Sequence, residues 1–119
     1  MRWCILALLA VLTACAAPQP LSRRDVALEV SWLAIHLVDY GQTRTVARNP
    51  DRYYECNPCY GEHPSADRID VLFPLGAALH PVVTWLLPPR WRPYWQGASI
   101  ASSGGCVVNN QQNGIRPDF

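Results

Sequence analysis

The chain has 119 residues, of which 50% are hydrophobic and 16% are charged. This composition excludes a disordered chain, because such chains are poor in hydrophobic residues and rich in charge. The formal net charge is only +1, whereas a nucleic-acid binder of this size carries a clear basic surplus. We therefore expect a single small folded domain without a nucleic-acid partner.

The N-terminus has the layout of a secretory signal peptide, with Arg2 followed by an apolar run from Cys4 to Ala14. This run is too short to cross a bilayer, which needs about 20 residues. It ends in Leu-Thr-Ala-Cys, residues 12–15, which resembles the bacterial lipobox. The resemblance implies cleavage before Cys15 and attachment of fatty acyl chains such as palmitate to that cysteine. The alternative is an ordinary signal peptide that happens to contain a cysteine.

Lipidation would make membrane lipid the first partner of the protein, through Cys15. Three acyl chains form a lasting anchor, since each buried CH2 contributes about 0.8 kcal/mol. We expect a periplasm-facing protein of a bacterial cell envelope, and Ala16, where an Asp would retain the protein in the inner membrane, slightly favours the outer membrane. Residues 1–14 are thus a signal-peptide helix, and residues 15–21 a lipidated tether.

The first mature helix is predicted over residues 22–48, with Ser22 as its N-cap. Glu29, His36 and Asp39 are spaced to share one face of this helix. They are interpreted as a solvated stripe or an internal polar network, with pairing to Arg44, Arg68 or His80. An ion or proton path is the functional alternative.

A second helix is predicted over 66–87 behind Ser65, and a poorer third over 93–108. Residues 71–87 carry no formal charge and approach a membrane span, although Pro74 and Pro81 lie within them. Residues 90–95 fit either a membrane-interface belt with its guanidinium groups in water or a buried turn.

The expected fold is therefore an all-α hairpin or bundle of two to three helices, joined by a Pro-rich loop over 49–65. Residues 22–108 form a helical membrane-associated domain, and residues 109–119 a polar tail.

From Val38 onward the pattern resembles a group of small bacterial and prophage membrane lipoproteins without an assigned activity. The matching segments are Asp39-Tyr40-Gly41-Gln42-Thr43-Arg44, Arg48 to Glu55, Asn57-Pro58, Gly61, His63-Pro64-Ser65, Leu87-Pro88-Pro89 and Trp95-Gln96. The resemblance implies a bacterial or prophage origin. It supplies no catalytic residue.

Cys56 and Cys59 form a C-x-x-C pair. A disulfide between them, or two free thiols, is the main interpretation, and a thioredoxin-like redox loop is the alternative. Cys56, Cys59 and His63 also have a spacing that suits three zinc ligands, but the second closely spaced pair of a strong zinc motif is missing. We therefore predict no cofactor, no metal and no enzyme activity.

The loop 49–65 is the predicted interaction surface, through Tyr53, Tyr54, Glu55, Asn57 and Tyr60. The sequence thus predicts a lipid-anchored, non-catalytic envelope protein that docks a partner protein or modifies the surface of a cell or prophage. A periplasmic thiol-disulfide or zinc protein using Cys56 and Cys59 is one alternative. A phage lysis lipoprotein is the other.

Overall fold

The computed structural model describes residues 18–55 and 57–119, which form three α-helices and contain no β-strand. They are α2 (Arg23–Arg48), α3 (Ala66–Leu86) and α4 (Arg92–Gln112). The predicted all-α class is confirmed. The predicted signal-peptide helix over 1–14, the predicted lipidation site Cys15 and the first cysteine of the C-x-x-C pair, Cys56, lie outside the described residues.

The first two helices begin where their serine caps predict. The hydroxyl of Ser22 accepts the backbone N–H of Asp25 while the Asp25 carboxylate accepts that of Ser22, which makes a reciprocal capping box. The hydroxyl of Ser65 accepts the backbone N–H of Arg68 at the start of α3. The helix α2 continues through Gly41 to Arg48, and α3 keeps both of its prolines inside the helix.

The third helix and the C-terminus differ from the prediction. The helix α4 runs to Gln112 rather than ending at residue 108, so the boundary between domain and polar tail was wrong. Beyond it Ile115 is buried, and the backbone N–H of Asp118 donates to the carbonyl of Gly41. The C-terminal segment therefore packs back onto α2 instead of fraying.

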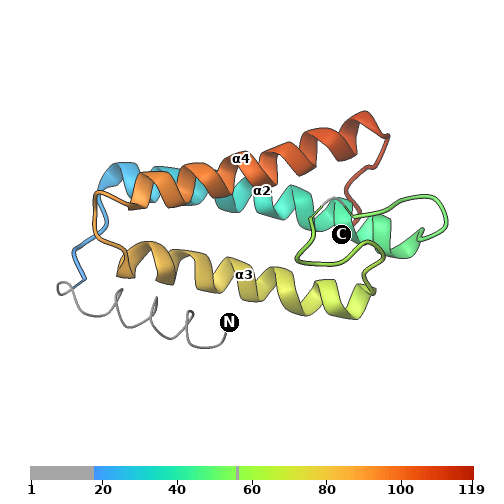
Figure 1. The fold of residues 1–119 in the computed structure, drawn as a ribbon, viewed down its shortest axis with the longest axis horizontal. Coiled ribbons are helices and arrows are strands. Elements are labelled where there is room, and N and C mark those ends of the chain that lie inside the picture. Colours follow the sequence, from blue (N-terminus) through green and yellow to red (C-terminus); the bar gives the residue numbers. More distant parts are fainter. Residues whose placement is uncertain (1–17, 56) are drawn as a thin grey trace.

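The three helices lie side by side along the long axis of the molecule (Figure 1), with α2 and α4 running in one direction and α3 in the other. The helix α2 packs against both neighbours, whereas α3 and α4 contact each other least. We call one end of the bundle, with residues 18–24 and 87–92, the tether end. The opposite end, with residues 40–70 and 109–119, is the loop end.

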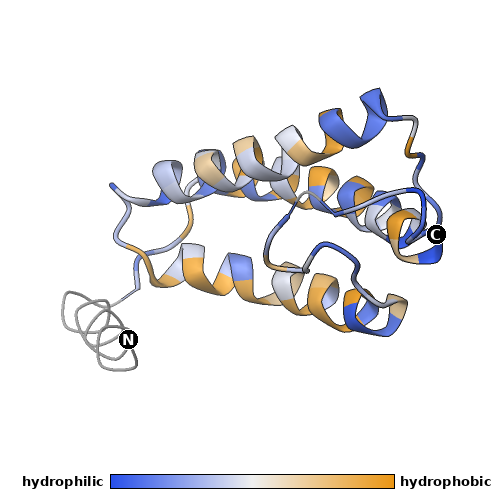
Figure 2. Ribbon diagram, turned by 45° about the vertical axis from the view of Figure 1, so that its right-hand side comes forward, coloured by the Kyte–Doolittle hydropathy of each residue, from blue (hydrophilic) through white to orange (hydrophobic). Residues whose placement is uncertain are grey.

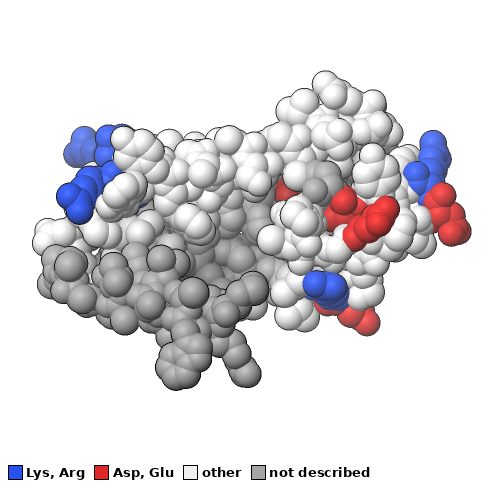
Figure 3. Space-filling view, viewed as in Figure 1, with Lys and Arg blue, Asp and Glu red and all other residues white. Residues whose placement is uncertain are grey.

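The polarity of this bundle is reversed relative to a water-soluble protein. Among the buried side chains described, eleven are polar or charged and six are hydrophobic, while seventeen large hydrophobic side chains are exposed. Apolar residues run along most of α3 and alternate with polar ones along α4 (Figure 2). In Figure 3 arginine side chains lie towards both ends of the bundle, and the acidic side chains that are visible lie towards the loop end. The wall of the bundle is thus apolar and its interior polar.

This interior follows a repeating spacing of four and three residues, which keeps one seam of each helix facing its neighbours. On α2 the seam contains Asp25, Glu29, Trp32, His36, Asp39, Thr43 and Val46. On α4 it contains Arg92, Gln96, Ser99, Ser103, Cys106 and Asn110. The helices therefore associate through seams in which most side chains are polar.

Candidate functional site

Side chains from all three helices meet at the carboxylate of Glu29. The ring nitrogen Nδ1 of His80 on α3 lies 2.5 Å from its Oε1, and the Thr84 hydroxyl lies 2.9 Å from its Oε2. The side-chain amide of Gln96 on α4 donates to the same Oε2 at 2.9 Å and to the backbone carbonyl of Asp25 at 2.8 Å. Glu29 thus joins α2, α3 and α4 through one acceptor group. Of the three partners considered for the face with Glu29, His36 and Asp39, His80 is the one that Glu29 contacts.

A column of stacked rings runs from the exposed Trp95 past this junction into the interior, in the order Trp95, His80, Trp32, His36, Phe73 and Tyr60. The closest pair is Trp32 on His80, with centroids 3.7 Å apart and planes inclined by 13°. The other neighbouring centroids lie 4.4 to 4.8 Å apart. His36 also donates from Nε2 to the backbone carbonyl of Phe73 at 3.0 Å, so hydrogen bonding as well as stacking fixes its ring.

A cavity of about 540 Å³ lies beside the ring column, where α3 and α4 make little contact. Its lining consists of aromatic and imidazole rings, small and aliphatic residues and three serines. These are Trp32, His36, Asn57, Cys59, Tyr60, Gly76, Leu79, His80, Val83, Trp95, Ala98, Ser99, Ser102 and Ser103. His80 lines this cavity and is only 6% exposed, and its second ring nitrogen, Nε2, has no hydrogen-bond partner among the described residues. The volume falls within the range of small-molecule sites.

Arg92 closes the bundle at the tether end and is 1% exposed. Its guanidinium donates to the carbonyls of Gln19, Pro20, Trp85 and Leu87 at 2.7 to 3.2 Å, and to the carboxylate of Asp25 at 3.4 Å. It therefore binds the tether to the turn between α3 and α4. The belt interpretation, which put its guanidinium in water, was wrong for Arg92, and the buried-turn alternative describes it.

Three further ionisable side chains are buried at the loop end: Asp39 on α2, and Glu55 and Tyr60 in the loop. Burial raises the pKa of the Tyr60 hydroxyl, and the nearby charges of Asp39, Cys59 and Glu55 raise it further. One oxygen of each carboxylate has no hydrogen-bond partner within the described ranges. The predicted polar face of α2 is thus interior at Asp39 as well as at Glu29, which excludes the solvated-stripe interpretation.

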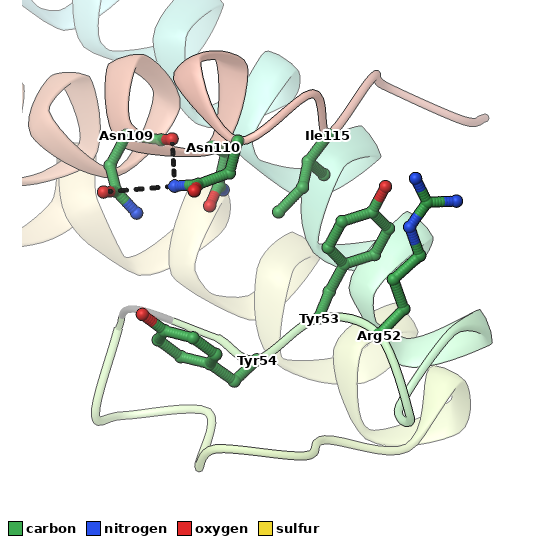
Figure 4. A pocket seen from close by; sticks show the side chains of 7 residues that line it. Arg52, Tyr53, Tyr54, Asn109, Asn110 and Ile115 are labelled. Atoms are coloured by element: carbon green, nitrogen blue, oxygen red, sulfur yellow. Dashed lines mark hydrogen bonds between the residues drawn. The ribbon is translucent and has the colours of Figure 1, made fainter.

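The predicted interaction loop divides between surface and interior. Tyr54 is exposed, while Glu55 and Tyr60 are buried, and Asn57 accepts the backbone N–H of Cys59. Tyr53 and Tyr54 line a second cavity of about 230 Å³ (Figure 4), together with Arg52, Asn109, Asn110, Asn113 and Ile115. Of the five predicted contact residues, Tyr54 is exposed, Tyr53 and Asn57 are partly buried, and Glu55 and Tyr60 are buried.

The structure decides between the two forms of the main interpretation at Cys59. Cys59 has a free, exposed thiol, so the disulfide with Cys56 is wrong, and the free-thiol alternative describes Cys59. Cys106, on α4, is disulfide-bonded, and its partner lies outside the described residues. No group of three or more His, Cys, Asp and Glu side chains in ranges 18–55 and 57–119 is arranged to hold a metal ion. The zinc hypothesis itself includes Cys56, which is not described, and stays a prediction.

Sequence reasoning missed Trp32, Thr84, Arg92 and Gln96 as members of the polar interior. The available signal was the alternating spacing of three and four residues on α4, which places Arg92 and Gln96 on one seam. Comparison of the chain with models of known families, with curated proteins and with solved structures finds no match.

Proposed function

We propose that the chain is a bacterial cell-envelope protein that is embedded in a membrane through α2, α3 and α4 and additionally anchored by lipid on Cys15. In this proposal it is not an enzyme and serves as an interaction component of a cell or prophage. The observation that supports this proposal most strongly is the reversed polarity of the bundle. Seventeen large hydrophobic side chains are exposed around a largely polar interior. In water this surface would be a severe aggregation hazard, whereas lipid tails satisfy it.

Helix length and composition support the proposal. Twenty-one residues of helix, as in α3 and α4, extend for about 31 Å at 1.5 Å per residue, close to the thickness of the hydrocarbon core. By hydropathy α3 is the one described helix that could cross a membrane, and 22% of its apolar window is buried. A core helix of a soluble protein would be mostly buried. The polar seams of α2 and α4 lower their average hydropathy, and on α4 Ser102, Asn109 and Gln111 are polar at exposed positions as well.

The ion pairs in the interior also support the proposal that the bundle is embedded in a membrane. Ionisable side chains within a bilayer face the bundle interior and pair with each other, as Glu29 does with His80 and Asp25 with Arg92. Exposed aromatic side chains gather at the tether end, where Trp85, Trp91 and Tyr94 suit the headgroup region. The loop end offers the segment 52–54 to a partner protein.

Membrane fractionation followed by alkaline carbonate extraction tests the proposal on the wild type and on Cys15→Ser. We expect both proteins to stay in the membrane pellet, because the helices hold the chain without the lipid. Intact mass should show acyl chains on the wild type and on the matched control Cys59→Ser, and none on Cys15→Ser. Release of Cys15→Ser by carbonate would refute embedding, and an unmodified wild-type mass would refute lipidation.

The two alternative functions have no specific support from the structure. A thiol-disulfide or zinc protein would require Cys56 beside Cys59, and only Cys59 is described. A phage lysis lipoprotein would fit the short chain and its lipobox, yet the extensive apolar faces of the bundle have no role in it. Both stay hypotheses.

A further inference from the structure

We propose that the cavity at the loop end, between the segment 52–54 and the end of α4, binds the headgroup of an anionic phospholipid. This inference rests on the embedding of the bundle under the proposed function, because the loop end of an embedded bundle lies among headgroups at a membrane surface. The cavity is separate from the Glu29 junction and the ring column. Its charge, the placement of its hydrogen-bond donors and the apolar wall beside it support this ligand.

The charge of the lining favours an anion. Arg52 is the one charged side chain among the described residues that line the cavity, and none of them is Asp or Glu. Its guanidinium lies over the ring of Tyr53, 5.1 Å from the centroid, and forms no ion pair within ranges 18–55 and 57–119. Arg52 is also exposed, so a ligand can reach it. A phosphate would supply its missing counter-charge, whereas the ammonium of a zwitterionic headgroup would meet no carboxylate in this lining.

Hydrogen-bond donors lie on both sides of the cavity, with Tyr53 and Tyr54 on one side and Asn109 and Asn110 on the other (Figure 4). The side-chain amide of Asn113 donates to the backbone carbonyl of Asn109 at 2.8 Å and to its side-chain oxygen at 3.5 Å. The NH2 group of Asn109 is thereby left to donate to a ligand. Asn109 is exposed, so this donor is accessible as well.

The size of the cavity suits a headgroup better than a bare phosphate. A water molecule takes about 30 Å³ in the liquid, so a cavity of about 230 Å³ holds more than the five heavy atoms of a phosphate. A phosphate that carries glycerol places oxygens at several points, which lets it contact Arg52 at one edge and the amide of Asn109 on the other side. The spread of the donors therefore favours phosphoglycerol over the free anion.

The wall beside the cavity accommodates the acyl chains. Val108 directly precedes Asn109 on α4 and is 54% exposed, and Ala101 and Gly105 are exposed further along the same helix. A lipid with its headgroup at Asn109 can thus lay its chains along α4 within the hydrocarbon layer. Pockets with basic side chains at a membrane surface bind anionic headgroups in this way. A water-soluble anion would make no use of this wall.

Native mass spectrometry of the purified full-length protein in detergent micelles tests the site, with dioctanoyl phosphatidylglycerol as the probe. We expect one tightly bound lipid per chain, and weaker binding of dioctanoyl phosphatidylcholine. Arg52→Gln should weaken the binding of phosphatidylglycerol about ten-fold, because it removes a charge-assisted hydrogen bond. Asn109→Ala should weaken it about five-fold, the worth of one neutral hydrogen bond. Both positions are exposed, so both variants should fold.

Arg90→Gln is the matched control, since it makes the same change at an exposed arginine of the tether end that does not line the cavity. It should bind phosphatidylglycerol as the wild type does. Equal weakening in Arg52→Gln and Arg90→Gln, or equal affinity for the two lipids, would show non-specific association and overturn the proposal. Displacement of the lipid by an equal concentration of inorganic phosphate would show a site for the free anion and overturn it as well. Carbonate extraction does not depend on this cavity, so the two proposals fail separately.

Discussion

Arg92 is the residue whose replacement should destabilise the bundle most clearly. The change Arg92→Met keeps a long unbranched side chain and removes the guanidinium. Four backbone carbonyls lose a donor, and the buried carboxylate of Asp25, which is 2% exposed, loses its counter-charge. Removing one partner of a buried ion pair costs about 3–5 kcal/mol. That is a large part of the roughly 5–15 kcal/mol by which a domain is stable.

The assay is thermal unfolding followed by circular dichroism in detergent, together with limited proteolysis of the tether. We expect Arg92→Met to unfold at a much lower temperature and to expose residues 18–22 to protease, because Gln19 and Pro20 lose their contacts to the turn before α4. Arg90→Met is the matched control, since Arg90 is exposed and such a change stays within about 0.5 kcal/mol. Equal stability of the two variants would refute the reasoning.

Three further predictions test other contacts of the bundle. Glu29→Gln should lower the free energy of unfolding by about 1–3 kcal/mol, because an amide cannot accept from His80, Thr84 and Gln96 as a carboxylate does. Thermal unfolding measures this loss, and an unchanged midpoint temperature would contradict it. Gly41→Ala should speed removal of the C-terminal residues by carboxypeptidase, since the added Cβ meets Phe119 and Pro117 at 2.9 Å; an unchanged rate would mean that the segment does not pack there. Maleimide should label the folded protein at the exposed Cys59 thiol, and labelling that persists in Cys59→Ser would show this assignment to be wrong.

The starts of the first two helices could be predicted because their signals are local. Ser22 and Ser65 each precede a long apolar run, and the structure uses both hydroxyls as caps. The end of α4 could not be predicted in this way, because Gly104, Gly105 and the amides after residue 108 resemble a loop. The contact that holds this end comes from α2, where Gln42 donates to the carbonyls of residues 107 and 115.

The candidate site could be predicted from the sequence only in part, because some of its contacts are long-range. The spacing of Glu29, His36 and Asp39 within one helix predicted a shared face, and the structure places that face inside. The role of Arg92 depends on carbonyls 72 and 73 residues away in the sequence. A local window showed only two arginines among aromatic residues, which is also typical of a membrane interface. Long-range hydrogen bonds decided between the two interpretations.

The contacts of Arg92 also connect the proposed lipid anchor to the orientation of the bundle. Since Gln19 and Pro20 are held at the tether end, a lipid on Cys15 places that end at the outer face of the membrane. In the inner membrane, the alternative to the outer membrane that Ala16 slightly favours, three crossings would bring residue 119 to the cytoplasmic side, so a fluorescent protein fused after Phe119 should fluoresce there and a periplasmic phosphatase should be inactive. The disulfide-bonded Cys106, on the half of α4 near the loop end, argues the other way, because the cytoplasm keeps thiols reduced. An active phosphatase fusion would therefore show that the loop end is outside, and that Cys15 lipidation and three crossings do not hold together.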